Sequence, residues 1–335
     1  MNTATRIAAA LLLAGTAFST AHAANGPSSD VPASGAPDVP SLAGKRIGIT
    51  TVGTSHYWDI KAYQAQVAEV KRLGGTPIAL DAGRDDKRQI AQIQTLISQH
   101  PDGIIEELGN AAVLEPWLKR IRKAGIPLLT VDTVSPSSIN DTTSDNHKIG
   151  RELAQQLVSD LHGHGSIILF NGFYSVPVCA IRYDELQAVL KQNPGITVIQ
   201  PELREVIPNT VQNAYSQITE ILSKYSQKGS IAAIWSAWDI PQIGATQALE
   251  AGHRNEVRTY GVDGSPEAVQ MLEDKNSPAA AIVAQQPSLI GKTAVDNMAR
   301  YLAGDRGLPG TTYIASRLVT KQNAAEVRKE LGQGS

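Results

Sequence analysis

The sequence predicts an α/β protein with two doubly wound sheets, and two observations carry this prediction. From Lys45 onward, short β-branched and apolar runs alternate with longer stretches of helical periodicity, which is typical of βαβ units in a parallel sheet. The alternation gives about nine consecutive strands, more than one open sheet usually holds, so we expect two sheets. The length of 335 residues and the hydrophobic content of 42% suffice for about two ordinary globular domains.

Glycine and proline punctuate the alternation in the first half of the sequence. Gly74, Gly75 and Gly125 end expected helices, and Pro101 marks another stop, because Gly readily adopts the conformation that closes a helix and Pro cannot continue one. The elements expected there are strand 46–52, helix 57–73, strand 76–80, helix 86–99, strand 102–106, helix 111–124 and strand 126–131.

After a polar stretch and a helix near 147–162, the same pattern restarts. The elements expected in this half are strand 166–171, helix 179–192, strand 196–200, helix 210–225, strand 231–235, helix 239–252, strand 257–262, helix 265–274, strand 279–284 and helix 288–303. The tail that follows has an Ala, Glu and Lys pattern suited to a short helix, and its packing stays open.

The N-terminal segment has the features of a secretory signal. Arg6 precedes an apolar run, and an Ala-His-Ala cleavage sequence ends at residue 23. The run is too short to cross a bilayer as a helix, so we expect residues 1–23 to be cleaved and the mature protein to be exported to the periplasm. Residues 24–44 are rich in Pro, Gly, Ser and Ala without an apolar period, which predicts a flexible leader.

Charge and cysteine content argue against several kinds of partner. Thirty Lys and Arg residues against 32 Asp and Glu give a formal net charge of −2, so nothing draws the chain to nucleic acid or to an anionic membrane. The single cysteine, Cys179, cannot form an internal disulfide, and no Cys/His cluster has the spacing of a zinc site. We therefore expect no metal and no cofactor, and we interpret Cys179 as a small buried residue.

Aromatic and charged side chains gather after the expected strands, where loops and helix N-termini converge and ligands bind in open parallel sheets. These residues are Ser55, His56, Tyr57, Trp58, Glu106, Glu107, Asp132 and Thr133 in the first half, and Arg182, Trp235, Ser236, Ala237, Trp238, Asp239, Asp263 and Gln285 in the second. Rings that cover C–H faces, together with charged groups that bond hydroxyls, suit a small polyhydroxylated ligand.

Seven segments carry a resemblance, in order, between Lys45 and about Gln322. They are KRIGITTVGTSHYWDI, AGIPLLTVDT, TTSDNHKIGRELA, AIRYDELQAVL, AIWSAWDIPQIGATQALEAG, TYGVDGSPEAVQML and AAAIVAQQPSLIGKTAVD. Together they resemble the type I periplasmic binding proteins of the ribose-binding kind. The resemblance implies two Rossmann-like lobes that are joined by a three-strand hinge and close on a ligand. It implies an N-terminal lobe at 45–144 plus 286–314, a C-terminal lobe at 145–285 plus 315–323, and a tail at 324–335.

The resemblance also implies a set of ligand-binding positions. By position, Tyr57 and Trp58 match the family's aromatic pair, and Ser55 matches the polar residue before it. Asp132 matches the carboxylate that ends the fourth strand, and Arg182 matches the ligand-clamping arginine. Asp239 matches the aspartate of an Asn-Asp pair, Asp263 the aspartate of the GxDG turn, and Gln285 the hinge glutamine. We expect these residues, with Glu107 and Trp238, to bind the ligand.

Three positions depart from the ribose-type pattern. The asparagine expected after the third strand falls at Glu107, or at Glu106 if the register slips by one, the arginine after Asp132 is Thr133, and the asparagine before Asp239 is Trp238. A pocket with an extra ring, an extra carboxylate and one fewer guanidinium is not expected to hold ribose in the family's manner.

Two ligand classes fit these residues. Pentoses, hexoses and their polyols suit aromatic covers beside Asp132, Asp263 and Arg182, because each carboxylate can accept from two hydroxyls. A methylated amine suits an aromatic cage with acidic neighbours, although Arg182 would repel a cation. We favour a solute-binding protein that captures a sugar or polyol and delivers it, as a monomer, to an ABC importer; the alternative is a ligand-sensing protein that partners a membrane sensor kinase.

Other functions find less support in the sequence. The Gly-x-Ser-x-Gly elbow, the Gly-x-Gly-x-x-Gly turn and a complete phosphate-binding loop are missing, so we expect no enzyme. Carboxylates that share a cleft leave a glycosidase pair open, which an assay of sugar hydrolysis would test. A signal and leader stand where related repressors carry a helix-turn-helix, which disfavours DNA binding. Trp117 is interpreted as packing, whereas Trp235 could face the core or the cleft.

Overall fold

The computed structural model describes residues 39–333. The predicted signal at 1–23, and the predicted leader up to residue 38, lie outside the described residues. Among the helices of the described part, none is both long enough and apolar enough to cross a membrane.

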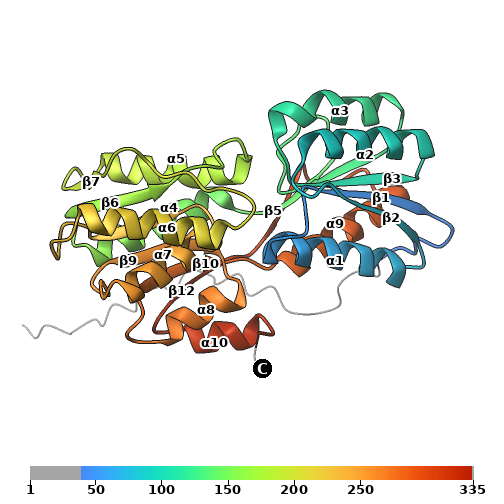
Figure 1. The fold of residues 1–335 in the computed structure, drawn as a ribbon. Coiled ribbons are helices and arrows are strands. Elements are labelled where there is room, and N and C mark those ends of the chain that lie inside the picture. Colours follow the sequence, from blue (N-terminus) through green and yellow to red (C-terminus); the bar gives the residue numbers. More distant parts are fainter. Residues whose placement is uncertain (1–38, 334–335) are drawn as a thin grey trace, which may run out of the picture. The chain divides into compact units, whose positions relative to one another are not determined.

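The strands form two six-stranded sheets, which confirms the expected fold class (Figure 1). The first sheet is entirely parallel, in the order β11 (Thr311–Ile314), β5 (Asp141–Ser144), β4 (Leu128–Val131), β3 (Gly103–Glu107), β1 (Arg46–Thr51) and β2 (Thr76–Asp81). The second has the order β12 (Arg317–Thr320), β10 (Ala279–Ala284), β9 (Arg258–Asp263), β8 (Ala233–Ser236), β6 (Gly165–Phe170) and β7 (Ile196–Val198), with β12 antiparallel to β10.

Helices cover both faces of each sheet, so that the central strands are apolar and buried on both sides (Figure 1). Those against the first sheet are α1 (Tyr57–Arg72) and α9 (Pro287–Leu302) on one face, and α2 (Asp86–Gln99) and α3 (Ala111–Lys123) on the other. Those of the second sheet are α4 (Asn146–Asp160) with α5 (Pro177–Lys191), and α6 (Thr210–Lys224), α7 (Asp239–Ala251) and α8 (Pro266–Glu273) with α10 (Ala324–Glu330). We call the two sheets with their helices the N-terminal lobe and the C-terminal lobe.

Within residues 39–333, the chain passes from one lobe to the other three times. It crosses from β5 into α4, from β10 into α9, and from β11 into β12. Each of the first two crossings leaves the carboxyl end of a parallel strand. The crossings therefore lie at the sheet edges where loops converge.

The sequence alternation missed the short strands β5, β11 and β12, and β5 lies within the stretch expected to be only polar. Its residues, DTTS, are buried although every side chain is polar. Two of them bond with residues of β4 and the turn after it: the hydroxyl of Thr130 donates to Asp141 Oδ1 at 2.9 Å, and that of Thr143 donates to Asp132. Hydrogen bonding between side chains therefore replaces the apolar pattern that marks the other strands.

The tail forms the short helix α10, and it packs on the C-terminal lobe beside α8. Val327 is buried in that contact, and Arg328 Nη1 donates to Glu273 Oε2 at 2.9 Å. This settles the packing that the sequence left open.

Candidate binding site

A cavity of about 50 Å³ lies between the two lobes, at the carboxyl ends of the strands. This volume is below the range of about 300–1,000 Å³ that is typical of small-molecule sites. The wall contributed by the N-terminal lobe consists of His56, Trp58, Asp59, Arg84, Leu108 and Asp132. The wall contributed by the C-terminal lobe consists of Phe173, Val176, Val178, Cys179, Arg182, Trp238 and Asp263.

The backbone at two strand ends brings carboxylates to this cavity. Asp132, just after β4, has φ of 52°, and Asp263, the last residue of β9, has φ of 105°. Positive φ is uncommon for residues other than Gly, and Asp tolerates it better than most. The chain turns sharply at both positions, and both side chains line the cavity.

Arg182 is held rigidly from α5, and only 2% of it is exposed. Its Nε donates to Asn146 Oδ1 at 2.8 Å, and its Nη1 donates to Ala237 O at 2.9 Å and to Asp263 Oδ1 at 3.3 Å. A Cβ on Gly150 of α4 would come within 2.8 Å of the Arg182 backbone, so this glycine permits the close approach of α4 and α5. The guanidinium is thus fixed before any ligand arrives.

Gln285 supports Asp263 from behind the cavity wall. Its Nε2 donates to Asp263 Oδ1 at 2.8 Å, and its backbone N–H donates to Asp263 O at 3.0 Å. Burial raises the pKa of Asp263 to about 6, while the nearby Arg182 guanidinium opposes that rise. Asp263 therefore stays ionised at neutral pH beside a cation.

Asp132 is buried with a weaker set of partners. The hydroxyl of Thr143 donates to its Oδ1. Burial raises the pKa of Asp132 to about 7, although the positive charge of Arg182 favours the ionised form. This carboxyl therefore changes its charge near neutral pH.

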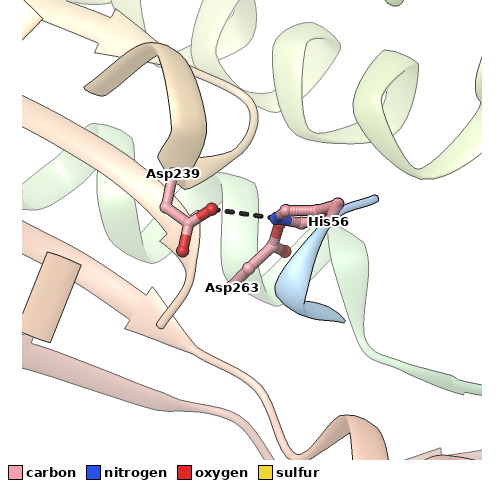
Figure 2. Close-up of side chains that lie close together, drawn as sticks. All are labelled: His56, Asp239 and Asp263. Carbon is pink, nitrogen blue, oxygen red and sulfur yellow. Dashed lines mark hydrogen bonds and ion pairs between the residues drawn. The ribbon is translucent and has the colours of Figure 1, made fainter. Parts of the chain in front are cut away.

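His56 joins the two lobes, and Figure 2 shows it beside Asp239 and Asp263. Its Nε2 lies 3.1 Å from Asp239 Oδ1 and 3.7 Å from Asp263 Oδ2, and its Nδ1 lies 3.5 Å from Asp59 Oδ1. Burial lowers the pKa of His56, but hydrogen bonds to Asp239 and Asp59 raise it more strongly, to about 10. The side chain is an imidazolium that bridges carboxylates of both lobes.

The donor atoms of His56, Asp239 and Asp263 lie within 4.8 Å of one another, a grouping that a metal ion could also use. Both ring nitrogens of His56 face carboxylate oxygens, at 3.1 and 3.5 Å, which favours a ring with a hydrogen on each nitrogen. A metal would need a ring nitrogen without its proton. We therefore interpret the group as an ion pair.

Aromatic rings from both lobes complete the cavity. The ring of Trp238 meets those of His56 and Phe173 edge to face, at centroid distances of 5.1 and 5.4 Å. Its Nε1 donates to Glu205 Oε1 at 3.1 Å, which fixes the indole. Trp58, in the first turn of α1, lines the cavity with only 2% exposure. Such rings can cover the C–H faces of a ligand.

Five of the ten residues expected to bind a ligand line the cavity: Trp58, Asp132, Arg182, Trp238 and Asp263. Three others support them. Asp239 bonds His56, and its Oδ2 accepts from Ser265 N at 2.8 Å; Gln285 bonds Asp263; and Ser55 Oγ accepts from Arg84 Nε at 3.4 Å.

Tyr57 and Glu107 lie outside the cavity wall. The hydroxyl of Tyr57 accepts from Gln333 Nε2 at 3.3 Å, on the side of the β10–α9 crossing. Consecutive helical residues point about 100° apart, so a Trp58 that faces the cavity turns Tyr57 away from it. The expected pairing of these two rings in one site is therefore not what the structure shows.

The carboxylates at the end of β3 also miss the cavity. Glu107 is fully buried within the N-terminal lobe, where it accepts from Thr51 Oγ1 at 2.9 Å and from Gln66. Glu106, the alternative register, is fully buried as well and accepts from Gln89 Nε2 at 3.2 Å. Leu108, with φ of 52°, is the residue that reaches the cavity from this strand end. Neither register places an acid there.

Two further expectations have structural answers. Trp235, left open between core and cleft, is completely buried in the C-terminal lobe against the ring of Tyr183. Cys179 is a buried residue as expected, but it also lines the cavity, and burial raises the pKa of its thiol to about 12. Its thiol is therefore not ionised at neutral pH.

Sequence reasoning assigned no ligand role to His56, Asp59, Arg84 or the apolar stretch around Phe173. Arg84 follows β2, and the rule that ligands meet strand carboxyl ends would have found it. His56 stood in the loop that was considered, but nothing in the sequence indicates that Asp239 and Asp263 come from the other lobe to meet it.

Comparison with known proteins gives consistent matches. A family model described as "Periplasmic binding protein domain" matches residues 47–306. The ribose import binding protein of Bacillus subtilis (strain 168) is 24% identical over 267 residues, which cover 77% of this chain and 83% of that protein.

Two solved structures are more similar in sequence. A solute-binding protein of an ABC transporter from Agrobacterium vitis, with bound allitol, is 58% identical, with a TM-score of 0.84 and coverage of 85% of this chain and 98% of that one. An ABC sugar transporter subunit from Rhodobacter sphaeroides 2.4.1 is 61% identical, with a TM-score of 0.83 and coverage of 84% and 100%. These matches agree with the resemblance that the sequence segments carried.

Proposed function

The chain belongs to the type I periplasmic binding proteins of the ribose-binding family, and we propose that it captures a monosaccharide or polyol between its lobes for an ABC importer. The observation that carries this proposal is the composition of the cavity. Buried carboxylates and a fixed guanidinium stand beside aromatic rings, all at the edges where two parallel sheets meet. The hydroxyls of a ligand form hydrogen bonds with the carboxylates and the guanidinium, and its C–H faces pack on the aromatic rings.

In this proposal Arg182, Asp132 and Asp263 bind hydroxyl groups. Nη2 of Arg182 takes no part in the bonds described above, so it donates to a ligand oxygen. The second oxygen of Asp132 accepts from a ligand hydroxyl, since Thr143 donates to the first. Micromolar affinity corresponds to about −8 kcal/mol, which a few such charge-assisted bonds and stacked rings supply after the cost of ordering the ligand.

The relatives support a polyhydroxylated ligand. The Agrobacterium vitis protein, 58% identical, holds allitol, an acyclic hexitol. We place the ligand of this chain in the same class of neutral polyols and sugars. Because the apolar Leu108 is the residue that reaches the cavity from the end of β3, and Trp238 replaces an asparagine of the ribose-type pattern, ribose itself is a weaker candidate.

We place the protein in the periplasm as a monomer, after removal of residues 1–23. It binds without chemistry, and its partner is the membrane permease of an importer. A membrane sensor is the second possible partner. Partner choice depends on the outer surfaces of the lobes, whereas ligand choice depends on the cavity.

The test is a thermal-shift and calorimetric panel on the mature protein, with allitol, galactitol, glucitol, ribose, galactose and trimethylamine N-oxide. We expect a raised unfolding midpoint and micromolar or tighter affinity with at least one polyol or sugar, because a ligand that binds only the folded state stabilises it. A response to the amine oxide alone would contradict the proposal. Unchanged ligand after prolonged incubation, followed by chromatography, checks that no hydrolysis occurs.

A further inference from the structure

We propose that His56 is a specificity-determining residue: its imidazolium is a built-in positive charge that lets the closed cavity accept a neutral polyhydroxylated ligand and reject a cationic one. The inference rests on the proposed function, since it concerns which members of a hydroxylated ligand class can enter the same site.

The backbone leaves the His56 side chain free for this role. His56 is the N-cap residue just before α1, with extended φ and ψ of −112° and 146°, and its carbonyl accepts from Ile60 N at 3.0 Å. Its side chain makes no capping bond to the helix. Instead the ring lies beside Asp239 and Asp263 of the C-terminal lobe, as Figure 2 shows, and the residue is 6% exposed.

The geometry itself favours the charged form. Nε2 lies 3.1 Å from an oxygen of Asp239 and Nδ1 lies 3.5 Å from an oxygen of Asp59. A neutral imidazole carries a hydrogen on only one nitrogen, so the other lone pair would face a carboxylate oxygen. Only an imidazolium donates in both directions.

Each of the other cations around the ring is paired with a carboxylate. The carboxylates that face it are Asp59 from α1, Asp239 from α7 and Asp263 from β9. Arg84 pairs with Asp59, and Arg182 pairs with Asp263. With Asp132, four carboxyl groups thus stand among three cations.

A cationic ligand therefore finds one carboxyl without a cation of its own, Asp132, whose pKa is raised to about 7, and no uncompensated pair of carboxylates. It would also bring its charge into a closed, buried space beside a fixed positive charge, where like charges repel strongly. If His56 were neutral, Asp239 would keep hydrogen bonds from neutral groups but lose the positive charge beside it, and a ligand cation could supply that charge.

The experiment compares a matched pair of probes, allitol and 1-amino-1-deoxyallitol, which is protonated at pH 7.5. Calorimetry gives the affinity ratio for the wild type, for His56→Asn and His56→Gln, which remove the charge, and for His147→Asn as control. His147 is also paired with a carboxylate, Glu185 at 2.9 Å, but lies exposed on α4.

We expect the wild type and the control to prefer allitol by about 100-fold, and the His56 variants to prefer it by less than about 10-fold. An unchanged preference in both folded His56 variants overturns the inference and leaves the proposed function intact, because the wild type still binds the polyol. If the wild type binds no neutral member of the panel, the proposed function fails and the inference fails with it.

A second measurement does not depend on how the variants fold. Nitrogen-15 NMR of the wild-type protein distinguishes an imidazolium from either neutral tautomer by the shifts of both ring nitrogens. We expect both nitrogens of His56 to be protonated at pH 7.5 in the ligand-free closed form. A neutral ring at that pH overturns the inference whatever the binding data show.

Discussion

The buried carboxyl groups of β3 and those of the cavity have similar burial and different partners. Glu106 and Glu107 receive hydrogen bonds only from amide and hydroxyl groups, and burial raises their pKa well above the ordinary value. Asp239 and Asp263 face the cations His56 and Arg182. A buried acid can therefore act as a binding group when a cation beside it keeps it ionised. A buried acid without a cation is a neutral structural group.

The largest expected effect comes from removing a charge on the cavity side. Asp263→Asn keeps the shape of the side chain but leaves Arg182 and His56 without this anion, so we expect ligand affinity to fall by about 100-fold or more. Calorimetry with the best ligand of the panel measures it. Glu107→Gln is the matched control and should change affinity by less than twofold. Equal losses in both variants would remove the distinction between the two sets of acids.

The aromatic wall should have the next largest effect. Trp58→Ala removes a ring that lines the cavity, and we expect affinity to fall by roughly 30-fold, which corresponds to about 2 kcal/mol of lost contact. Trp117→Ala is the control, because that ring lies on α3 beneath Arg120, at 3.9 Å from its guanidinium carbon. Wild-type affinity in the Trp58 variant would show that this ring does not contact the ligand.

Binding should depend on pH through Asp132. Its pKa is raised to about 7, so the carboxylate that accepts from a ligand hydroxyl is lost as the pH falls through that value. We expect affinity to weaken by about tenfold between pH 7.5 and 6, with proton release on binding. Calorimetry in buffers of different ionisation enthalpy measures both. Asp132→Asn should flatten the profile, and an equally steep profile in this variant would assign the dependence elsewhere.

On the structural side of the comparison, Glu106→Gln should stabilise the fold at high pH. Folded Glu106 keeps its proton well above pH 4.5, whereas the unfolded chain loses it near that value, so stability falls as the pH rises above about 4.5. We expect the variant to gain about 1 kcal/mol in unfolding free energy at pH 8 and nothing at pH 4. Urea unfolding at both pH values measures it, with exposed Glu220→Gln as control.

The smallest effect is expected at Tyr57. Its hydroxyl accepts from Gln333 outside the cavity, so Tyr57→Phe should leave ligand affinity within twofold of the wild type. A calorimetric titration under the same conditions as for Trp58→Ala makes the two residues directly comparable. A tenfold loss would return Tyr57 to the ligand site.

Most of the fold followed from the sequence because strands and helices alternate with clear periods. The strands that it missed are short and either polar or edge strands: β5 is held by hydroxyl and carboxylate bonds, and β12 pairs antiparallel at the end of its sheet. An apolar pattern cannot reveal such strands, since side-chain bonding and pairing with distant chain, rather than burial of apolar faces, define them.

Part of the candidate site could be predicted from the sequence, because ligand-binding residues of parallel sheets lie just past the carboxyl ends of strands. Residues just past strand ends, such as Asp132 and Asp263, follow from the convergence of loops at the carboxyl edge. Glu107 does not line the cavity because it is still part of β3, where the register of the strand decides which face of the sheet a side chain occupies. The chain turns into the cavity one residue later, at Leu108. The His56 bridge depends on contacts across more than 180 positions of sequence.

The supports of two cavity residues sit on the segments where the chain changes lobes. Asn146, which holds Arg182, begins α4 directly after the first crossing, and Gln285, which holds Asp263, opens the second. Any rotation of one lobe against the other twists these same peptides. The same short segments therefore connect the lobes and hold the ligand-binding side chains, so that bending between the lobes changes how Arg182 and Asp263 hold the ligand. We expect removal of the side-chain amide of Asn146 or of Gln285 to alter the angle of opening, although neither amide contacts the ligand.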